Sequence, residues 1–219
     1  DKANSLVSSN GGNVSITGQG GGTGNSGNNF GVAIGTLGRI SAGLNGTVTV
    51  NGTGGSPTGN FNTGVYVNSG HASITSSGGN VSVTGIGGSS IPASSSSANA
   101  GVYILSSIIN AGGNGNVVVH GTGGTGGVNS GTAYGVFLNG SAASINSNNG
   151  NVSVTGIAGG SGTTNSNYGI LVESAATITA GGSGTVTLNG TGGPSNGGNN
   201  HGISIRNANS KISSNGGAV

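Results

Sequence analysis

Side chains that could do acid–base chemistry are scarce and scattered in this chain. Its only carboxylate side chains are those of Asp1 and Glu173, two in 219 residues. Glycoside hydrolysis uses a pair of carboxylates on either side of the scissile bond, and these two lie far apart in the sequence. The sequence therefore predicts a protein that is not an enzyme and that binds no cofactor.

The residues that commonly hold metal ions or phosphate are equally sparse. His71, His120 and His201 fall at three different positions of the repeat described below, and the chain has no cysteine. Calcium-binding β-roll repeats need an aspartate in every turn, and this chain has one. The glycine-rich stretch 20–24 lacks the lysine and the helix of a phosphate-binding loop. We therefore expect no metal or phosphate site.

Charged side chains make up only six positions, four Lys or Arg and two Asp or Glu. Nucleic-acid binding requires many cations that neutralise phosphates, so that function class is excluded. No apolar run approaches the length of a membrane span. No secretion signal is present in these residues, so if the protein is exported, we expect its signal to have been removed or to lie outside them. A neutral coat of Ser, Thr, Asn and Gly is less typical of cytosolic domains, which rely on charge for solubility. We expect an extracellular protein.

One pattern, in which valine, any residue, an aliphatic residue, any residue and glycine follow one another, recurs six times. A self-similar period of this size indicates a stacked repeat architecture, and it overrules the disorder that 53 glycines would otherwise suggest. The first valines, 33 to 36 residues apart, are Val14, Val48, Val81, Val117, Val152 and Val186.

Each unit of about 34 residues carries two further strand signals, because apolar residues two apart between Gly, Asn and Ser are typical of strands. The second signal is an apolar–x–apolar triplet that follows Gly31, Gly64, Gly101, Gly135, Gly169 and Gly202. The third is centred on Ile40, Ile74, Ile109, Ile145, Ile178 and Ile212.

The spacings favour one topology. Only the segment between the two glycines of each unit varies, from 12 to 16 residues, while the other connections are nearly constant. Three short strands per coil, fixed corners and one variable loop predict an all-β, right-handed parallel β-helix (β-solenoid) of six coils. Antiparallel sandwiches and propellers are weaker alternatives, since a propeller blade needs about four strands in 40 to 45 residues.

Two details of the coil follow from residue type. We expect the corner glycines to adopt positive φ, which glycine does without steric cost. Asparagines also recur at one corner, where we expect an amide ladder that bonds backbone groups between coils; they are Asn13, Asn80, Asn116 and Asn151.

Alternate units resemble each other most closely, so the sequence predicts three two-coil modules, approximately 13–79, 80–150 and 151–217. Residues 1–14 match residues 206–219, so the chain ends in the register in which it begins. Solenoids need polar caps on their end coils, and neither end has such a sequence. We expect 1–219 to be one uncapped β-solenoid segment, either part of a longer polypeptide or a unit that stacks end to end with copies of itself.

The outward residues of the first strand form a candidate hydroxyl face. Similar ranks occur on the ice-binding surface of some antifreeze proteins, which suggests ice or a polysaccharide as a ligand. Serine, asparagine, valine and histidine interrupt the ranks, and a merely solvated face is the alternative. The candidate residues are Ser15, Thr17, Thr49, Ser82, Thr84, Ser153, Thr155 and Thr187.

A second candidate surface is an apolar stripe at the middle of the second strand, formed by Tyr66, Tyr103, Phe137 and Leu171. Exposed aromatic patches tend to mark interfaces, so the stripe is a candidate lateral contact for bundling or adhesion. In the alternative interpretation, the variable loop folds back over the stripe and is anchored by Phe30, Tyr134 and Tyr168.

The repeat unit, for example residues 74–85 (ITSSGGNVSVTG), resembles the repeats of giant secreted bacterial proteins. These are the filamentous-haemagglutinin-like and autotransporter-passenger adhesins. The resemblance implies a right-handed parallel β-helix that serves as a scaffold on the outside of a bacterial cell. It leads us to expect a structural filament or adhesin segment whose partners are other copies of itself and cell-surface or matrix polysaccharide.

Overall fold

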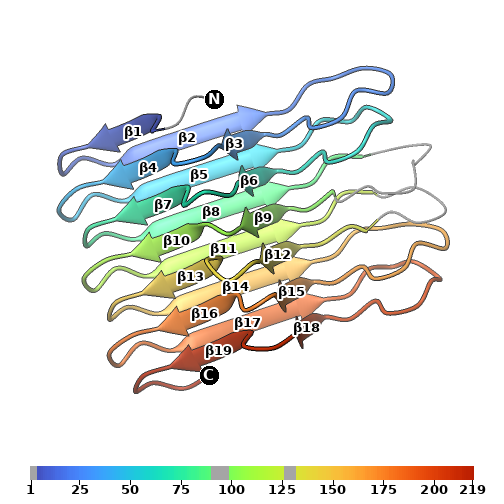
Figure 1. The fold of residues 1–219 in the computed structure, drawn as a ribbon. Coiled ribbons are helices and arrows are strands. Elements are labelled where there is room, and N and C mark those ends of the chain that lie inside the picture. The colour runs from blue at the N-terminus through green and yellow to red at the C-terminus, as the bar shows by residue number, and fades with distance from the viewer. Residues whose placement is uncertain (1–3, 90–98, 126–131) are drawn as a thin grey trace.

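The computed structural model describes residues 4–89, 99–125 and 132–219, in which the chain winds as a β-solenoid of about six coils (Figure 1). No helix occurs in these residues. Each coil contributes one strand to each of three parallel sheets, A, B and C, and successive coils stack along the axis from the N-terminus to the C-terminus.

Sheet A has seven short strands: β1 (Leu6–Ser9), β4 (Arg39–Ala42), β7 (Ser73–Ser76), β10 (Ile108–Ala111), β13 (Ser144–Ser147), β16 (Thr177–Ala180) and β19 (Lys211–Ser214). Sheet B has six longer strands: β2 (Val14–Gln19), β5 (Val48–Thr53), β8 (Val81–Ile86), β11 (Val117–Thr122), β14 (Val152–Ile157) and β17 (Val186–Thr191). Sheet C has six short strands: β3 (Val32–Ile34), β6 (Val65–Val67), β9 (Val102–Leu105), β12 (Val136–Asn139), β15 (Ile170–Glu173) and β18 (Ile203–Arg206).

The sheets confirm the predicted period and the three strands per coil. Equivalent positions of the repeat are paired without a slip, so that Val117 of β11 lies between Val81 of β8 and Val152 of β14. Strand β1 was not predicted, although Val7 pairs with Ile40 in the same register. The match between residues 1–14 and residues 206–219, which contain β19, is the signal that points to it.

A single hydrophobic core fills the space between the three sheets. Its side chains are the inward Val, Ile, Leu and Ala residues of every coil, and those of the middle coils are fully buried, as Val83, Ile104 and Ile109 are. Because each coil is thin, its apolar side chains are covered mainly by those of the coils above and below. Stability therefore depends on stacking rather than on any one coil.

Corner glycines were expected to adopt positive φ, and this is confirmed for Gly11, Gly113 and Gly182 at the corner between sheets A and B. It is wrong for the glycines that end the sheet B strands and for those before sheet C, none of which has positive φ. The two sets face each other instead: a Cβ on Gly121, for example, would lie 2.1 Å from the carbonyl oxygen of Gly135. The backbones of sheets B and C approach so closely there that no side chain fits. This contact closes the core and separates it from an arm, the segment between the two glycines (Figure 1).

The predicted amide ladder at the corner between sheets A and B is confirmed. The Oδ1 atoms of Asn13, Asn80, Asn116 and Asn151 each accept a hydrogen bond from a backbone N–H of the next coil, at 2.8 to 2.9 Å.

The corner between sheets A and B has two alternating forms. In every second coil a serine such as Ser76 donates to the carbonyl of Gly79, whereas the intervening coils carry an inward alanine and close with a backbone turn such as Gly46 N to Gly43 O.

A second amide ladder, which the sequence did not predict, runs inside the arms. It is formed by the asparagine two residues before the glycine that precedes sheet C. Asn62 and Asn167 are fully buried. The Oδ1 of Asn167 accepts from the backbone N–H of Ala133 at 2.9 Å, and its Nδ2 donates to Asn200 Oδ1 at 3.0 Å and to Thr164 Oγ1 at 2.9 Å. The arms lack an interior of apolar side chains, and the hydrogen-bonded amides of this ladder take its place.

We predict that Gly121→Ala destabilises the protein by about 3 kcal/mol or more, because the new Cβ overlaps a backbone carbonyl that cannot rotate away. Urea unfolding followed by circular dichroism measures the effect. The matched control is Gly21→Ala, since a Cβ on Gly21 has no atom within 4 Å; its effect is expected to stay within about 0.5 kcal/mol. Equal effects of the two substitutions would contradict the close-contact interpretation.

We predict that Asn167→Ala costs about 3 kcal/mol of unfolding free energy, because it leaves the buried N–H of Ala133 without its acceptor. Asn151→Ala removes a ladder bond of the same kind, to the N–H of Thr185, at an exposed corner where water replaces it. That control is expected to cost about 1 kcal/mol. A larger loss for Asn151→Ala than for Asn167→Ala would show that the arm ladder does not stabilise the fold.

Candidate interaction surfaces

The outer face of sheet B carries the predicted hydroxyl residues, and all of them point away from the core. They lie in two columns along the stacking axis, because the strands pair in register. In the first column Thr49 lies between Ser15 and Ser82, and in the second Asn51 lies between Thr17 and Thr84. Thr155 continues the second column, and Ser153 and Thr187 continue the first. All eight side chains are half-buried or exposed.

A third outward column, at the last residue of each sheet B strand, was not predicted. It consists of Gln19, Thr53, Ile86, Thr122, Ile157 and Thr191. Ile86 is 47% exposed and Ile157 39%, and in the first column Val118 is 45% exposed. The prediction stopped at the glycine of the repeat, whereas the strand extends one residue beyond it.

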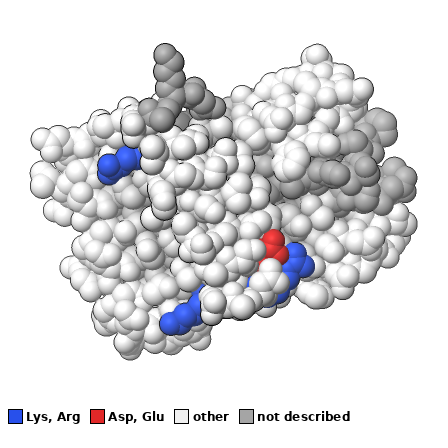
Figure 2. All heavy atoms as spheres, viewed as in Figure 1, with Lys and Arg blue, Asp and Glu red and all other residues white. Residues whose placement is uncertain are grey.

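No outward position of sheet B carries a charged side chain. Figure 2, which has the viewpoint of Figure 1, shows charged atoms in only a few small spots of an otherwise uncharged surface. Sheet A differs, because Arg39 and Lys211 occupy one of its columns, and sheet C ends in Glu173 and Arg206. Sheet B is therefore the broadest uncharged face of the solenoid.

The aromatic residues form a second feature, here called the aromatic seam, in the angle between sheet C and the arms. Each ring lies within 4.6 to 5.8 Å of the next, centroid to centroid, and Tyr103 and Phe137 are stacked at an angle of 14°. Tyr134 and Tyr168 are also stacked, at 6°, whereas the other ring pairs are tilted by 31° to 56°. In order, the seam consists of Phe30, Tyr66, Tyr103, Phe137, Tyr134, Tyr168 and His201.

The predicted contact stripe is part of this seam, but half of it is not exposed. Phe137 is 6% exposed and Leu171 is fully buried, because Tyr134 and Tyr168 from the ends of the arms pack over them. At these two residues the interpretation in which the variable loop folds back over the stripe is confirmed, and the open stripe is not. Tyr66 and Tyr103 remain half-exposed. A contact role for these two tyrosines stays a prediction.

The seam ends in the single ion pair found among the described residues. Arg206 Nε donates to Glu173 Oε2 at 2.6 Å, and Arg206 Nη1 donates to the hydroxyl of Tyr168 at 3.3 Å. The guanidinium carbon also lies 5.3 Å from the centre of the Tyr168 ring. Burial lowers the pKa of Arg206, but the Glu173 carboxylate outweighs this effect and raises it. The only described carboxylate side chain is therefore held in a structural contact.

The histidines do not come together. His71 lies at an exposed corner, His120 on the outer face of sheet B, and His201 at the end of the seam. In the described ranges no group of three or more His, Cys, Asp or Glu side chains could hold a metal ion. No helix in those ranges has the length and apolar character of a membrane span.

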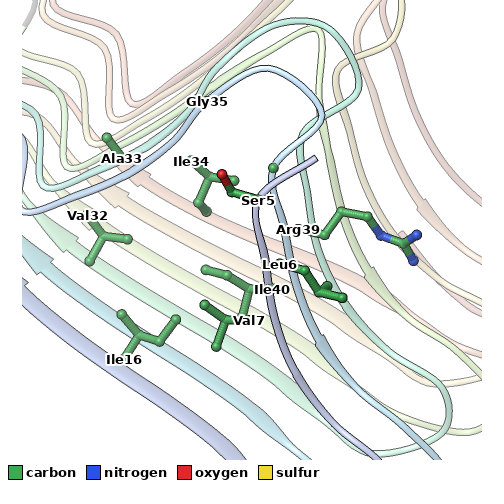
Figure 3. Close-up of a pocket in the computed structure, with 11 residues that line it drawn as sticks. Ser5, Leu6, Val7, Ile16, Val32, Ala33, Ile34, Gly35, Arg39 and Ile40 are labelled. Atoms are coloured by element: carbon green, nitrogen blue, oxygen red, sulfur yellow. The ribbon is translucent and has the colours of Figure 1, made fainter. Parts of the chain in front are cut away.

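The two ends of the stack each show an apolar hollow. At the N-terminal end, Leu6, Val7, Ile16, Ile34 and Ile40 surround a space of about 250 Å³ between β1, β2, β3 and β4 (Figure 3). At the C-terminal end, Leu188, Ile203, Ile205 and Ile212 line a shallower hollow. Apart from Leu6, which pairs with Arg39 on the outer face of sheet A, these side chains belong to the core columns, so the hollows are cross-sections of the core rather than separate ligand pockets.

Comparison of the chain with protein-family models, with curated proteins and with solved structures found no match.

We predict an alkaline transition from the seam. Burial raises the pKa of the Tyr103 phenol to about 12, with a further contribution from Tyr66, and Tyr103 ionises near pH 10 in the unfolded chain. The folded state then holds the proton longer, so stability falls as the pH rises from about 10 to about 12. The difference in absorbance near 295 nm between wild type and Tyr103→Phe isolates this phenol. Ionisation of Tyr103 near pH 10 in the folded protein would contradict its burial in the seam.

Proposed function

We propose that this chain is a structural, non-catalytic section of an extracellular filament or surface adhesin of a bacterial cell, in which the solenoid is a rod-like scaffold. The observation that carries the proposal is the unbroken register of all three sheets through every described coil. Core columns, glycine contacts and corner amides recur from coil to coil. A scaffold needs such continuity, whereas a catalytic site needs a local departure from the repeat.

The use of polar side chains supports this proposal. The buried amides bond to neighbouring coils, the corner serines close turns, and Glu173 is paired with Arg206. These amides, serines and the one described carboxylate side chain are therefore engaged in holding the coils together. The neutral outer surface agrees with an extracellular location, since it lacks the charges on which cytosolic domains rely for solubility.

We propose that a longer rod forms when further coils stack in the same register, either from the same polypeptide or from another copy. Stacked strands lie about 4.8 Å apart, so six coils rise about 29 Å.

Binding of ice or a polysaccharide to the hydroxyl face stays a prediction. The columns of Ser and Thr are in register, which favours it, but Val118, Ile86 and Ile157 interrupt them with exposed apolar side chains.

Antibodies raised against the purified chain test the proposed function on intact cells of the source organism. We expect gold-labelled antibody to bind unpermeabilised cells along thin surface fibres, and we expect preincubation with the purified chain to abolish the labelling. Labelling that appears only after permeabilisation would contradict an extracellular scaffold.

A further inference from the structure

We propose that two copies of this solenoid pair face to face through the outer faces of sheet B, with the rods antiparallel and a two-fold axis along β11. The proposal rests on the proposed function, since it names the lateral partner of the scaffold as a second rod of the same kind. It also moves the lateral contact from the aromatic seam, where the prediction had placed it, to the flat face.

Sheet B suits such a contact because pairing would bury no charge. The outward positions of its strands carry Ser, Thr, Asn, Gln, Val, Ile and one histidine, His120. Burying an unpaired charge would cost several kcal/mol, and this cost is absent here. Two sheets pack face to face about 10 Å apart when their side chains are of this short, neutral kind.

The exposed apolar residues of the face are arranged to complement themselves. Ile86 and Ile157 both pair with Thr122 of β11, one from β8 and the other from β14, so they lie at the same height along the strand on either side of β11. A two-fold axis along β11 exchanges β8 and β14. It therefore places Ile86 of one copy opposite Ile157 of the other, twice, as an isologous interface requires.

Val118 completes the patch. It lies on β11 itself, so the same axis places it opposite its own equivalent in the second copy. Ile86, Val118 and Ile157 are the large hydrophobic side chains that are exposed on the outer face of sheet B. A two-fold axis parallel to the solenoid axis would instead place Ile86 opposite the polar first column, at Ser82.

The area of the face is that of a weak contact. An axis along β11 brings five of the six strands opposite each other, β5, β8, β11, β14 and β17. Five strands about 4.8 Å apart and six residues of about 3.3 Å each span about 480 Å² on one copy. Pairing would then cover about 950 Å² in total, in the range of weak, transient interfaces. In a longer rod the same face recurs with every coil, so the contacts act together as a multivalent interaction.

The other surfaces offer less. In the aromatic seam, the ring faces of the stacked pairs Tyr103–Phe137 and Tyr134–Tyr168 already contact each other and offer few contacts to a partner. The outer face of sheet A carries Arg39 and Lys211, and sheet C ends in the Glu173–Arg206 pair.

Sedimentation equilibrium of the purified chain tests the pairing. We expect a concentration-dependent dimer in the wild type. We expect Val118→Lys to raise its dissociation constant at least about tenfold, because two ammonium groups then face each other across the axis. Val118 is exposed, so the fold is expected to tolerate the change. The matched control is Thr75→Lys, at an outward, half-buried position of β7 in sheet A, which should leave the dimer unchanged.

Cross-linking tests the geometry, since the chain has no native cysteine. We expect a short bismaleimide to join Ile86→Cys to Ile157→Cys in a mixture of the two variants more efficiently than it joins either variant to itself. Val118→Cys alone should form the cross-linked dimer. Preferential cross-linking of Ile86→Cys to itself would overturn the proposed axis.

A wild type that stays monomeric up to about 1 mM, or a dimer that Val118→Lys leaves intact, would overturn the pairing. A monomer that shows thermal hysteresis or sediments with insoluble cellulose would overturn it as well and would assign the face to that ligand. None of these results would contradict the scaffold proposal, which depends on where the protein lies on the cell.

Discussion

Every other feature of this protein depends on the stacking of coils in register, about 4.8 Å apart. At that distance each side chain has its own repeat equivalents as nearest neighbours, so a residue is tolerated only if it packs or bonds with residues of similar kind. Valine, isoleucine and leucine satisfy this condition in the core columns. Asparagine satisfies it at the corners and in the arms, because one amide can accept from the next coil while it donates elsewhere.

The same constraint explains the scarcity of charge. A charged residue that recurred in each coil would place like charges about 4.8 Å apart, at a cost of about 1 kcal/mol per pair even in water and more near the protein. The described ion pair is consistent with this argument, since Glu173 and Arg206 are direct register partners in β15 and β18. Opposite charges in one column attract each other, but such a pair requires two neighbouring coils to carry different residues at the same position of the repeat.

The fold could be predicted from the sequence because every coil repeats the same pattern of residues. The period, the three strands of a coil and the corner ladder at Asn80 and Asn116 follow from residues that recur at fixed spacing. The burial of Phe137 and Leu171 did not follow, because it depends on Tyr134 and Tyr168 from the variable arms. Gly121 was recognised as an anchor but given the wrong reason, since only the cross-section shows how closely it approaches Gly135.

Because stacking disfavours recurring charges, the surface of the solenoid also lacks the charged side chains that usually prevent association. Soluble proteins keep their sheets apart with inward or edge charges, especially lysine. Sheet A keeps such charges at two positions of one column, where their neighbours are uncharged: Arg39 lies between Leu6 and Ser73, and Lys211 pairs with Thr177. The middle of the sheet B face has no such charge, since Val118 lies between Ser82 and Ser153. The regularity that stabilises the rod along its axis therefore leaves its broadest face without charge, which is the condition on which the proposed pairing depends.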